Sequence, residues 1–286
     1  MNYNLLTLSW EDILNLDKEK LVVFVGIAPI EEHGRHLPIG VDIYETDEWI
    51  NLAINKLDSI LPSYCYGKLP IIPLGFADMG TFPGNIHISR ELIYKIIYST
   101  LKNIVKWGVK NIVVISAHAD PLHTIAIEQA CESINKEYGI ISIAPMGSIF
   151  NCEQKGILRK FSNSIKEKIK LFPNDFHAGW IETSNMLSLY PELVNDNYQE
   201  RPDISIQDNE MMNIQKVINT IKNEGHIGFP KEASEELGVE LNNDIGEQIY
   251  IATHNFILRS NYEKYMNHPL YHVPNLKFKT YNYYNT

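Results

Sequence analysis

Two residue types that bind transition metals, carboxylate and imidazole, occur together in one short segment of the chain. It runs from Glu31 through His33 to Asp42 and follows an apolar, β-branched run that is typical of a buried strand. Side chains alternate in an extended segment, so Glu31 and His33 point to one side and Glu32 to the other. Gly34 lets the chain turn, and Asp42 begins the next expected helix. Such donors suit Zn, Mn or Fe, although a capped surface loop would use the same residues.

The same residue types recur at two later places. His118 and Asp120 follow another expected strand, where alternation again puts them on one side, and His177 and Glu182 lie at the expected start of a helix. Each pair also has a purely structural interpretation. A lone histidine is commonly a hydrogen-bonded core residue, and Asp120 before Pro121 is a typical helix cap. The recurrence of the pairing at strand ends favours a shared site.

Hydrophobic periodicity predicts the elements that would position these residues. Strands are expected at 21–27, 69–74, 111–116 and 140–144, and helices at 43–60, 89–107, 120–138 and 206–223. Apolar strands that alternate with helices indicate an α/β fold with a mostly parallel sheet covered on both faces. In such folds ligands gather at the carboxyl ends of the strands, which is where the metal-binding residue types lie.

Composition and charge restrict the class of protein. The 286 residues are 44% hydrophobic and 21% charged, with no repeat or flexible linker, which predicts one domain over 1–286. A tail rich in Tyr and Asn from about residue 261 is expected to wrap over the surface or over a neighbouring subunit. The net charge of −10 argues against nucleic acid and membrane as partners. Three cysteines without metal or redox spacing, and no secretory signal, predict a cytoplasmic protein.

Four motifs in a fixed order make the chain resemble the creatininase (creatinine amidohydrolase) family. They are Glu-x-His-Gly-x-His-Leu-Pro-x-x-x-Asp at 31–42, Phe-Pro-Gly at 82–84, the strand-end histidine at 118, and His-Ala-Gly-x-x-Glu-Thr-Ser at 177–184. A weaker match at 225–234 extends the resemblance to about residues 20–240. The resemblance implies a three-layer α/β/α domain, two divalent metal ions per chain, hydrolysis of carbon–nitrogen bonds in small amides, and a homohexamer.

Carried over position by position, the resemblance implies two ligand sets. Glu31, Asp42 and His118 would hold one ion, and His33, Asp42 and Asp120 would hold the other. Asp42 would therefore bridge the two ions.

Two further residues receive roles from the same resemblance. His177 would sit over the substrate as a proton donor or binding group. Many members have glycine where Asp120 stands and complete the second site with the glutamate that corresponds to Glu182. Glu182 is therefore expected to be a metal ligand, a base or a residue that supports the ligands.

Departures from the family pattern bear on the substrate. Asp78 and Met79 stand where members often have Glu-His, and Ala119 replaces an aromatic residue of creatininase. Asp175 lacks the preceding tryptophan, and Arg35 stands at a position where proline is common. Arg35 could pair with a carboxylate or phosphate, or lie on the surface. We expect these five positions to bind or border the substrate. We also expect the substrate to be a compound other than creatinine.

The expected reaction follows from the chemistry of a dinuclear site. Two ions lower the pKa of a shared water from about 15.7 toward roughly 7, and the bridging hydroxide attacks the carbonyl of a small cyclic or linear amide. An amine leaves poorly unless it is protonated, so His177 is expected to assist nitrogen departure, with Glu182 as a second catalytic group. Two alternatives stay open: a creatininase-family peptidase that trims a modified peptide precursor, and a catalytically inactive metal-bound binding or assembly subunit.

Overall fold

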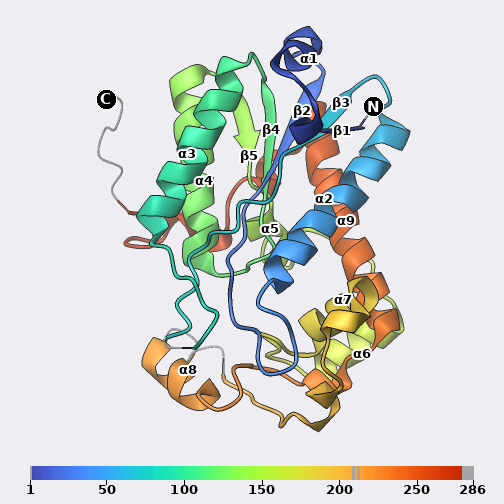
Figure 1. Cartoon of the computed structure of the whole chain (residues 1–286), viewed down its shortest axis with the longest axis vertical. Helices are drawn as coiled ribbons and strands as arrows, with labels where there is room; N and C mark the ends of the chain where they lie inside the picture. Colours follow the sequence, from blue (N-terminus) through green and yellow to red (C-terminus); the bar gives the residue numbers. More distant parts are fainter. Residues whose placement is uncertain (1, 81, 208–209, 211–212, 279–286) are drawn as a thin grey trace.

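A five-stranded parallel sheet forms the centre of the protein. The computed structural model describes residues 2–80, 82–207, 210 and 213–278 (Figure 1). Within them the strand order is β1-β3-β2-β4-β5, with β1 (Asn2–Asn4), β2 (Leu21–Gly26), β3 (Cys65–Lys68), β4 (Asn111–Ile115) and β5 (Ile141–Ile143). Each neighbouring pair is parallel, so the carboxyl ends of the strands share one edge of the sheet.

Helices cover both faces of this sheet. α2 (Val41–Ile60) and α9 (Glu235–Ile257) pack together on one face, and α3 (Arg90–Lys106) and α4 (Pro121–Tyr138) on the other (Figure 1). The expected three-layer α/β/α fold with a mostly parallel sheet is therefore confirmed. The shorter helices are α1 (Trp10–Asn15), α5 (Met146–Phe150), α6 (Asn163–Leu171), α7 (Trp180–Leu189) and α8 (Ile214–Ile221). Among the described helices, none combines the length and apolar character needed to cross a membrane.

Alternation along β2 separates two apolar cores. Val22 and Phe24 belong to the core beneath α2 and α9, whereas Val23 and Val25 belong to the core beneath α3 and α4. All four side chains are fully buried. Burial on both faces explains the uninterrupted apolar run that predicted this strand.

One expected strand is displaced along the sequence. Residues 69–74 lie outside the named strands, and β3 occupies Cys65–Lys68 instead. Leu69 and Ile72 still donate backbone hydrogen bonds to β2. Pro70 and Pro73 lack a backbone N–H, so this stretch cannot form a continuous ladder. The other three strands are confirmed to within one residue at each end.

The helix predictions succeed at 43–60, 89–107 and 120–138, where the structure differs by at most two residues at an end. The prediction at 206–223 is wrong in extent, because α8 spans only Ile214–Ile221. The side chain of Asn213 accepts a hydrogen bond from the N–H of Lys216 and so caps this shorter helix. Residues 208–209 and 211–212 lie outside the described residues.

α9, the longest of the described helices, was not expected from the sequence. Its interior contains Gly238 and Gly246, and glycine lowers helix propensity by about 1 kcal/mol relative to alanine. A Cβ atom at Gly238 would lie 1.8 Å from the backbone oxygen of Ser184 in α7, and one at Gly246 would lie 2.6 Å from Cβ of Leu52 in α2. The glycines therefore let α9 approach both helices closely, which is a tertiary requirement.

The described part of the C-terminal tail lies along α3 and α4 of the same chain. Tyr271 is buried, and its hydroxyl donates to the Glu132 carboxylate in α4. The ring of Phe278 lies 5.1 Å from that of Tyr94 in α3, measured between centroids. Residues 279–286 lie outside the described residues.

Candidate metal centre

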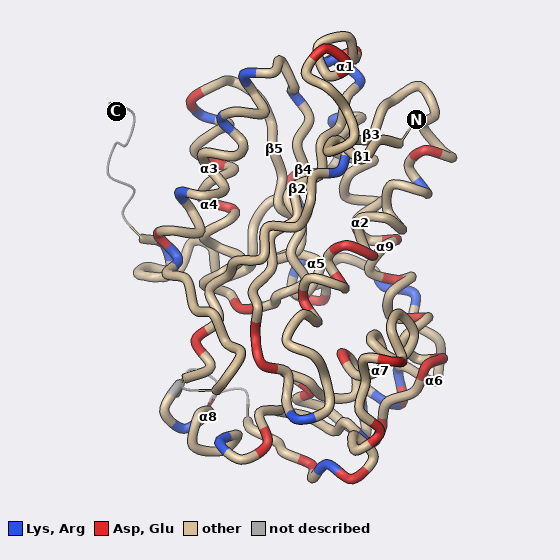
Figure 2. Tube along the Cα trace, in the orientation of Figure 1, with Lys and Arg blue, Asp and Glu red and all other residues tan. Residues whose placement is uncertain are grey.

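Four chain segments meet beyond the carboxyl edge of the sheet, which faces downward in Figure 1. They are the loop between β2 and α2, the first turn of α2, the turn after β4 and the segment that leads into α7. Figure 2 shows acidic positions on the segments that leave this edge. Because all strands run in parallel, residues distant in the sequence converge here, as the topology predicts.

The first group of possible metal ligands consists of Glu31, Asp42 and His118. The Nδ1 atom of His118 lies 3.0 Å from Oε2 of Glu31 and 3.5 Å from Oδ2 of Asp42. Both carboxylates are 2% exposed. Two carboxylate oxygens and one imidazole nitrogen at this spacing can hold a divalent ion.

The second group consists of His33, Asp42 and Glu182. The Nε2 atom of His33 lies 3.9 Å from Oδ1 of Asp42 and 3.8 Å from Oε2 of Glu182. Asp42 thus presents one carboxylate oxygen to His118 and the other to His33. A carboxylate placed in this way can bridge two cations.

Backbone carbonyl oxygens orient both imidazole rings. The Nδ1 atom of His33 lies 3.0 Å from the backbone oxygen of Glu31, and Nε2 of His118 lies 2.9 Å from that of Phe76. A carbonyl oxygen only accepts hydrogen bonds, so each of these ring nitrogens carries the proton. The opposite nitrogen of each ring then offers its lone pair to the ligand group, which is the usual arrangement for a metal-binding histidine.

Buried atoms without partners test whether the residues fit metal ions. Within the described residues, Glu31 Oε2, His33 Nε2 and Asp42 Oδ2 are buried and make no hydrogen bond. Each such atom costs about 1–3 kcal/mol unless something binds it. A cation at each group would satisfy all three, so the residues fit a pair of metal ions.

The electrostatics also favour positive charge at this place. Burial would lower the pKa of His118, but the Glu31 and Asp42 carboxylates raise it well above its usual range. Burial likewise opposes ionisation of Asp42, but the neighbouring His118 imidazole holds the pKa of Asp42 at about 2. The cluster therefore stabilises a cation beside ionised carboxylates.

Glu182, rather than Asp120, completes the second group. Oδ1 of Asp120 accepts the N–H groups of Leu122 and His123 at 2.6 and 3.2 Å and caps α4, and the ligand groups found among the described residues do not include it. The Glu182 carboxylate accepts the N–H of Ala178, whose φ of 49° lies in the left-handed region. This strained turn aims the carboxylate at the centre.

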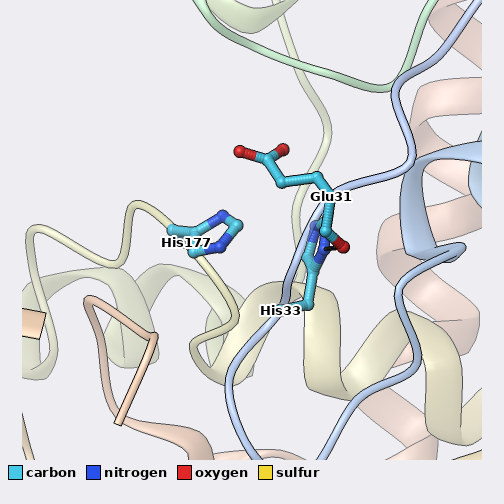
Figure 3. A group of neighbouring side chains, drawn as sticks. All are labelled: Glu31, His33 and His177. Carbon is cyan, nitrogen blue, oxygen red and sulfur yellow. Dashed lines mark hydrogen bonds between the residues drawn. The ribbon is translucent and has the colours of Figure 1, made fainter. Parts of the chain in front are cut away.

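His177 lies beside both groups, in the segment that leads into α7 (Figure 3). Its ring centroid is 4.5 Å from that of His33, and with Glu31 and His33 it forms a third possible ligand group. Its Nε2–H donates to the backbone oxygen of Glu32 at 2.7 Å, and the Glu32 carboxylate lies 3.6 Å from the same nitrogen. Burial would lower the pKa of His177, but Glu32 and the Glu31 charge raise it to about 10.

Sequence reasoning overlooked Glu45, which is buried beside the second group. It lies three residues after Asp42 in α2, and its Oε1 accepts a hydrogen bond from Nδ2 of Asn185 at 2.8 Å. Burial, followed by the charge of Glu182, raises the pKa of Glu45 well above its usual range. The helical spacing from Asp42 was the signal available in the sequence.

The positions expected to border the substrate differ in their surroundings. Asp78 and Ala119 are exposed. Met79 packs with Phe82 against the apolar cluster around α8. Arg35 is 58% exposed, and its Nε donates to the backbone oxygen of Asn223 at 2.8 Å.

Asp175 has a structural task at the start of α7. Its carboxylate accepts the backbone N–H groups of Trp180, Ile181 and Phe229 at 2.9 to 3.0 Å. Burial raises the pKa of Asp175 to about 7, against the lowering effect of these donors. The residue thereby fixes the segment that carries His177.

The structure is thus an α/β fold in which paired groups of side chains could hold metal ions. A family model described as creatinine amidohydrolase matches residues 6–252. The chain therefore belongs to the creatininase (creatinine amidohydrolase) family, whose members are amidohydrolases that act on carbon–nitrogen bonds other than peptide bonds. The expected family membership is confirmed.

Individual relatives are distant in sequence. Creatinine amidohydrolase of Pseudomonas putida is 20% identical over 183 residues, which cover 60% of this chain and 66%, slightly less than two thirds, of that protein. A mutant creatininase complexed with creatine is 15% identical, with a TM-score of 0.68, and the match covers 90% of this chain and 99% of the other.

Two further similar structures are described by their metals. One creatininase structure, described with Mn, has a TM-score of 0.66 at 15% identity and covers 90% of this chain and 99% of that one. Another, a mutant creatininase of Zn-Zn type, has a TM-score of 0.64 at 16% identity and covers 87% and 96%. At these identities the likeness shows a common fold.

Proposed function

We propose that this protein is a hydrolase that uses two divalent metal ions to cleave the carbon–nitrogen bond of a small cyclic or linear amide other than creatinine. The observation that carries the proposal is the pair of ligand groups that share Asp42, with buried ligand atoms that lack any other partner. Zn, Mn and Fe all accept carboxylate oxygen and imidazole nitrogen. The Mn and Zn-Zn creatininase structures support the first two.

Glu31, Asp42 and His118 would hold one ion, and His33, Asp42 and Glu182 the other. When bound, such a pair supplies a water molecule of lowered pKa and polarises the amide carbonyl. The backbone carbonyls behind His33 and His118 keep each imidazole aimed at its ion.

His177 is the group that protonates the departing nitrogen. Hydrogen bonding to Glu32 fixes the ring by its Nε2 atom, so the Nδ1–H is the proton available to the substrate. The antiparallel bridge between His177 and Ile227 holds the backbone of this segment in place. Glu182, whose Oε2 lies 3.8 Å from Nε2 of His33, would serve as the second catalytic group and accept a proton.

The site residues are tested first by metal analysis of the purified protein. Wild type should contain about two ions per chain, Asp42→Ala should lose both, and His118→Ala should lose at least one. His254→Ala in α9 serves as the matched histidine control and should keep both. Activity of the Asp42 variant should fall by roughly 10³-fold or more, since it removes a shared ligand. A wild type that takes up no added Zn, Mn or Fe would overturn the proposal.

The substrate class is tested with the metal-loaded wild type. Cyclic amides, formamides and short peptides are compared by kcat/KM under identical conditions. Saturable hydrolysis of small amides is the expected result. Hydrolysis of peptides alone would favour the peptidase, and full metal content without any turnover would favour a binding or assembly subunit.

We also propose a cytoplasmic homohexamer. The hexamer rests on the family resemblance, and the cytoplasm is supported by Cys65, Cys131 and Cys152, which are unpaired. Light scattering coupled to size-exclusion chromatography measures the assembly, and a stable monomer would contradict it.

A further inference from the structure

The contact between α2 and α7 contains a buried hydrogen bond one helical turn below the second ligand group. Asp42 and Glu182 lie in the first turns of α2 and α7. Three residues later on these helices stand Glu45 and Asn185, and residues at this spacing share a helix face. The Asn185 Nδ2 group donates to Oε1 of Glu45 at 2.8 Å, and the side chains are 2% and 3% exposed. Glu45 and Asn185 thus face each other one helical turn after Asp42 and Glu182 on the same two helices.

α9 holds Asn185 from the other side. Asn242 donates through Nδ2 to the backbone oxygen of Asn185 at 3.3 Å and to Oγ of Ser188 at 2.9 Å. The indole N–H of Trp49 in α2 donates to Oδ1 of Asn242 at 2.6 Å. The close approach at Gly238 brings α9 near enough to take part. A continuous polar network therefore connects α2, α7 and α9 and restricts how α7 can shift or rotate against α2.

We propose that the Glu45–Asn185 hydrogen bond is a positioning device that sets the separation of Asp42 and Glu182, and with it the affinity of the protein for the ion they hold with His33. Glu45 and Asn185 act through the two helices. The inference rests on the proposed function, because it presupposes that a second ion binds.

The first ligand group gives an internal reference for this effect. Glu31 comes from the loop after β2, and His118 from the turn after β4. The two groups share Asp42 on α2, and only the second group includes a residue of α7, Glu182. Loss of the hydrogen bond should therefore lower the affinity of the second group for its ion and leave that of the first group unchanged. General damage to the fold would lower both affinities.

The test compares Glu45→Leu, Asn185→Leu and the double variant with wild type. Each single variant leaves a buried polar group unpaired, which costs stability, whereas the double variant replaces both partners by apolar groups and should regain much of it. Metal content should fall from about two ions to about one in all three. Titration with Zn or Mn should show that the site formed by His33, Asp42 and Glu182 loses about 10- to 100-fold in affinity, relative to wild type.

Two conservative variants keep the test decisive if the leucine variants fold poorly. Glu45→Gln retains the acceptor oxygen and should keep both ions. Glu45→Asp shortens the side chain by one methylene and should weaken the second ion. Tyr94→Phe is the matched control, because it removes the buried hydrogen bond between Tyr94 and Ser133 that links α3 to α4, and it should leave both ions bound.

The outcomes separate this inference from the proposed function. If wild type and the double variant both bind two ions with equal affinity, the positioning role is wrong and the dinuclear site stands. If wild type itself binds fewer than two ions, the proposed function fails and the positioning role fails with it. Loss of both ions in a folded Glu45→Asp protein would indicate general damage and would also overturn the positioning role.

Discussion

The two helical layers that enclose the sheet make different use of burial. α3 and α4 meet through apolar side chains such as Ile97, Leu101 and Ile134, with the Tyr94–Ser133 hydrogen bond as a buried exception. Where α2 meets α7 and α9, apolar side chains such as Ile50 and Ile249 also pack together, but buried carboxylate and amide side chains such as Glu45 and Asn185 hydrogen-bond among them. The first contact contributes mainly apolar burial, whereas the second adds hydrogen bonds that restrict the positions of Asp42 and Glu182 in the proposed site.

The difference follows from what each layer must hold. Apolar packing tolerates exchanges of similar volume, so it fixes helix positions only loosely. Hydrogen bonds between buried side chains demand particular distances and directions, and leaving one unmade is costly. Under the proposed function, such bonds on the side that carries Asp42 and Glu182 would make the ligand geometry specific.

The largest expected effect is loss of catalysis without loss of fold. His177→Gln should lower kcat by about 10²–10⁴-fold, because it removes the proton donor while the longer amide side chain can still donate to the Glu32 carbonyl in place of Nε2. Steady-state kinetics on a hydrolysed amide measures the effect. Metal content and the free energy of unfolding serve as controls. A kcat within threefold of wild type would show that His177 is not the proton donor.

In the α3/α4 layer we expect a substitution to lower stability without lowering catalysis. Ile97→Ala removes a fully buried side chain and should lower the free energy of unfolding by about 2–4 kcal/mol, measured by urea denaturation. The kcat and the metal content of the remaining folded protein should match wild type. A parallel loss of metal would show that the two layers are coupled more tightly than their contacts indicate.

A smaller effect concerns the metal-free protein and pH. The folded pKa of His177, about 10, lies above the ordinary value of 6.5, so its protonation stabilises the fold fully below about pH 6.5. That stability is lost as the pH rises through 10, with a slope of at most about 1.4 kcal/mol per pH unit. Denaturation of chelator-treated wild type and His177→Gln between pH 7 and 9 measures it. The free energy of unfolding should fall less steeply with pH in the variant than in wild type. Equal slopes would contradict the raised pKa of His177.

Much of the site could be predicted because local sequence determines it. Alternation in the segment after β2 placed Glu31 and His33 together, and parallel topology brought His118 to them. The choice between Asp120 and Glu182 was open. The structure groups Glu182 with His33 and Asp42 and uses Asp120 to cap α4, and this arrangement depends on backbone geometry, such as the left-handed turn at Ala178, that side-chain type does not reveal.

The sequence by itself determined the alternating strands and helices, the three-layer class and the residue types of the site, because periodicity and strand-end position are local properties. Only the tertiary structure decided the place of β3, the existence of α9 and the burial of Glu45 against Asn185. Pro70 and Pro73 prevent a strand at 69–74, so β3 lies earlier in the chain. Gly238 and Gly246 lower the helix propensity of α9, so the sequence did not predict that helix. The last of the three depends on two helices whose contact is set by packing across more than a hundred residues of chain.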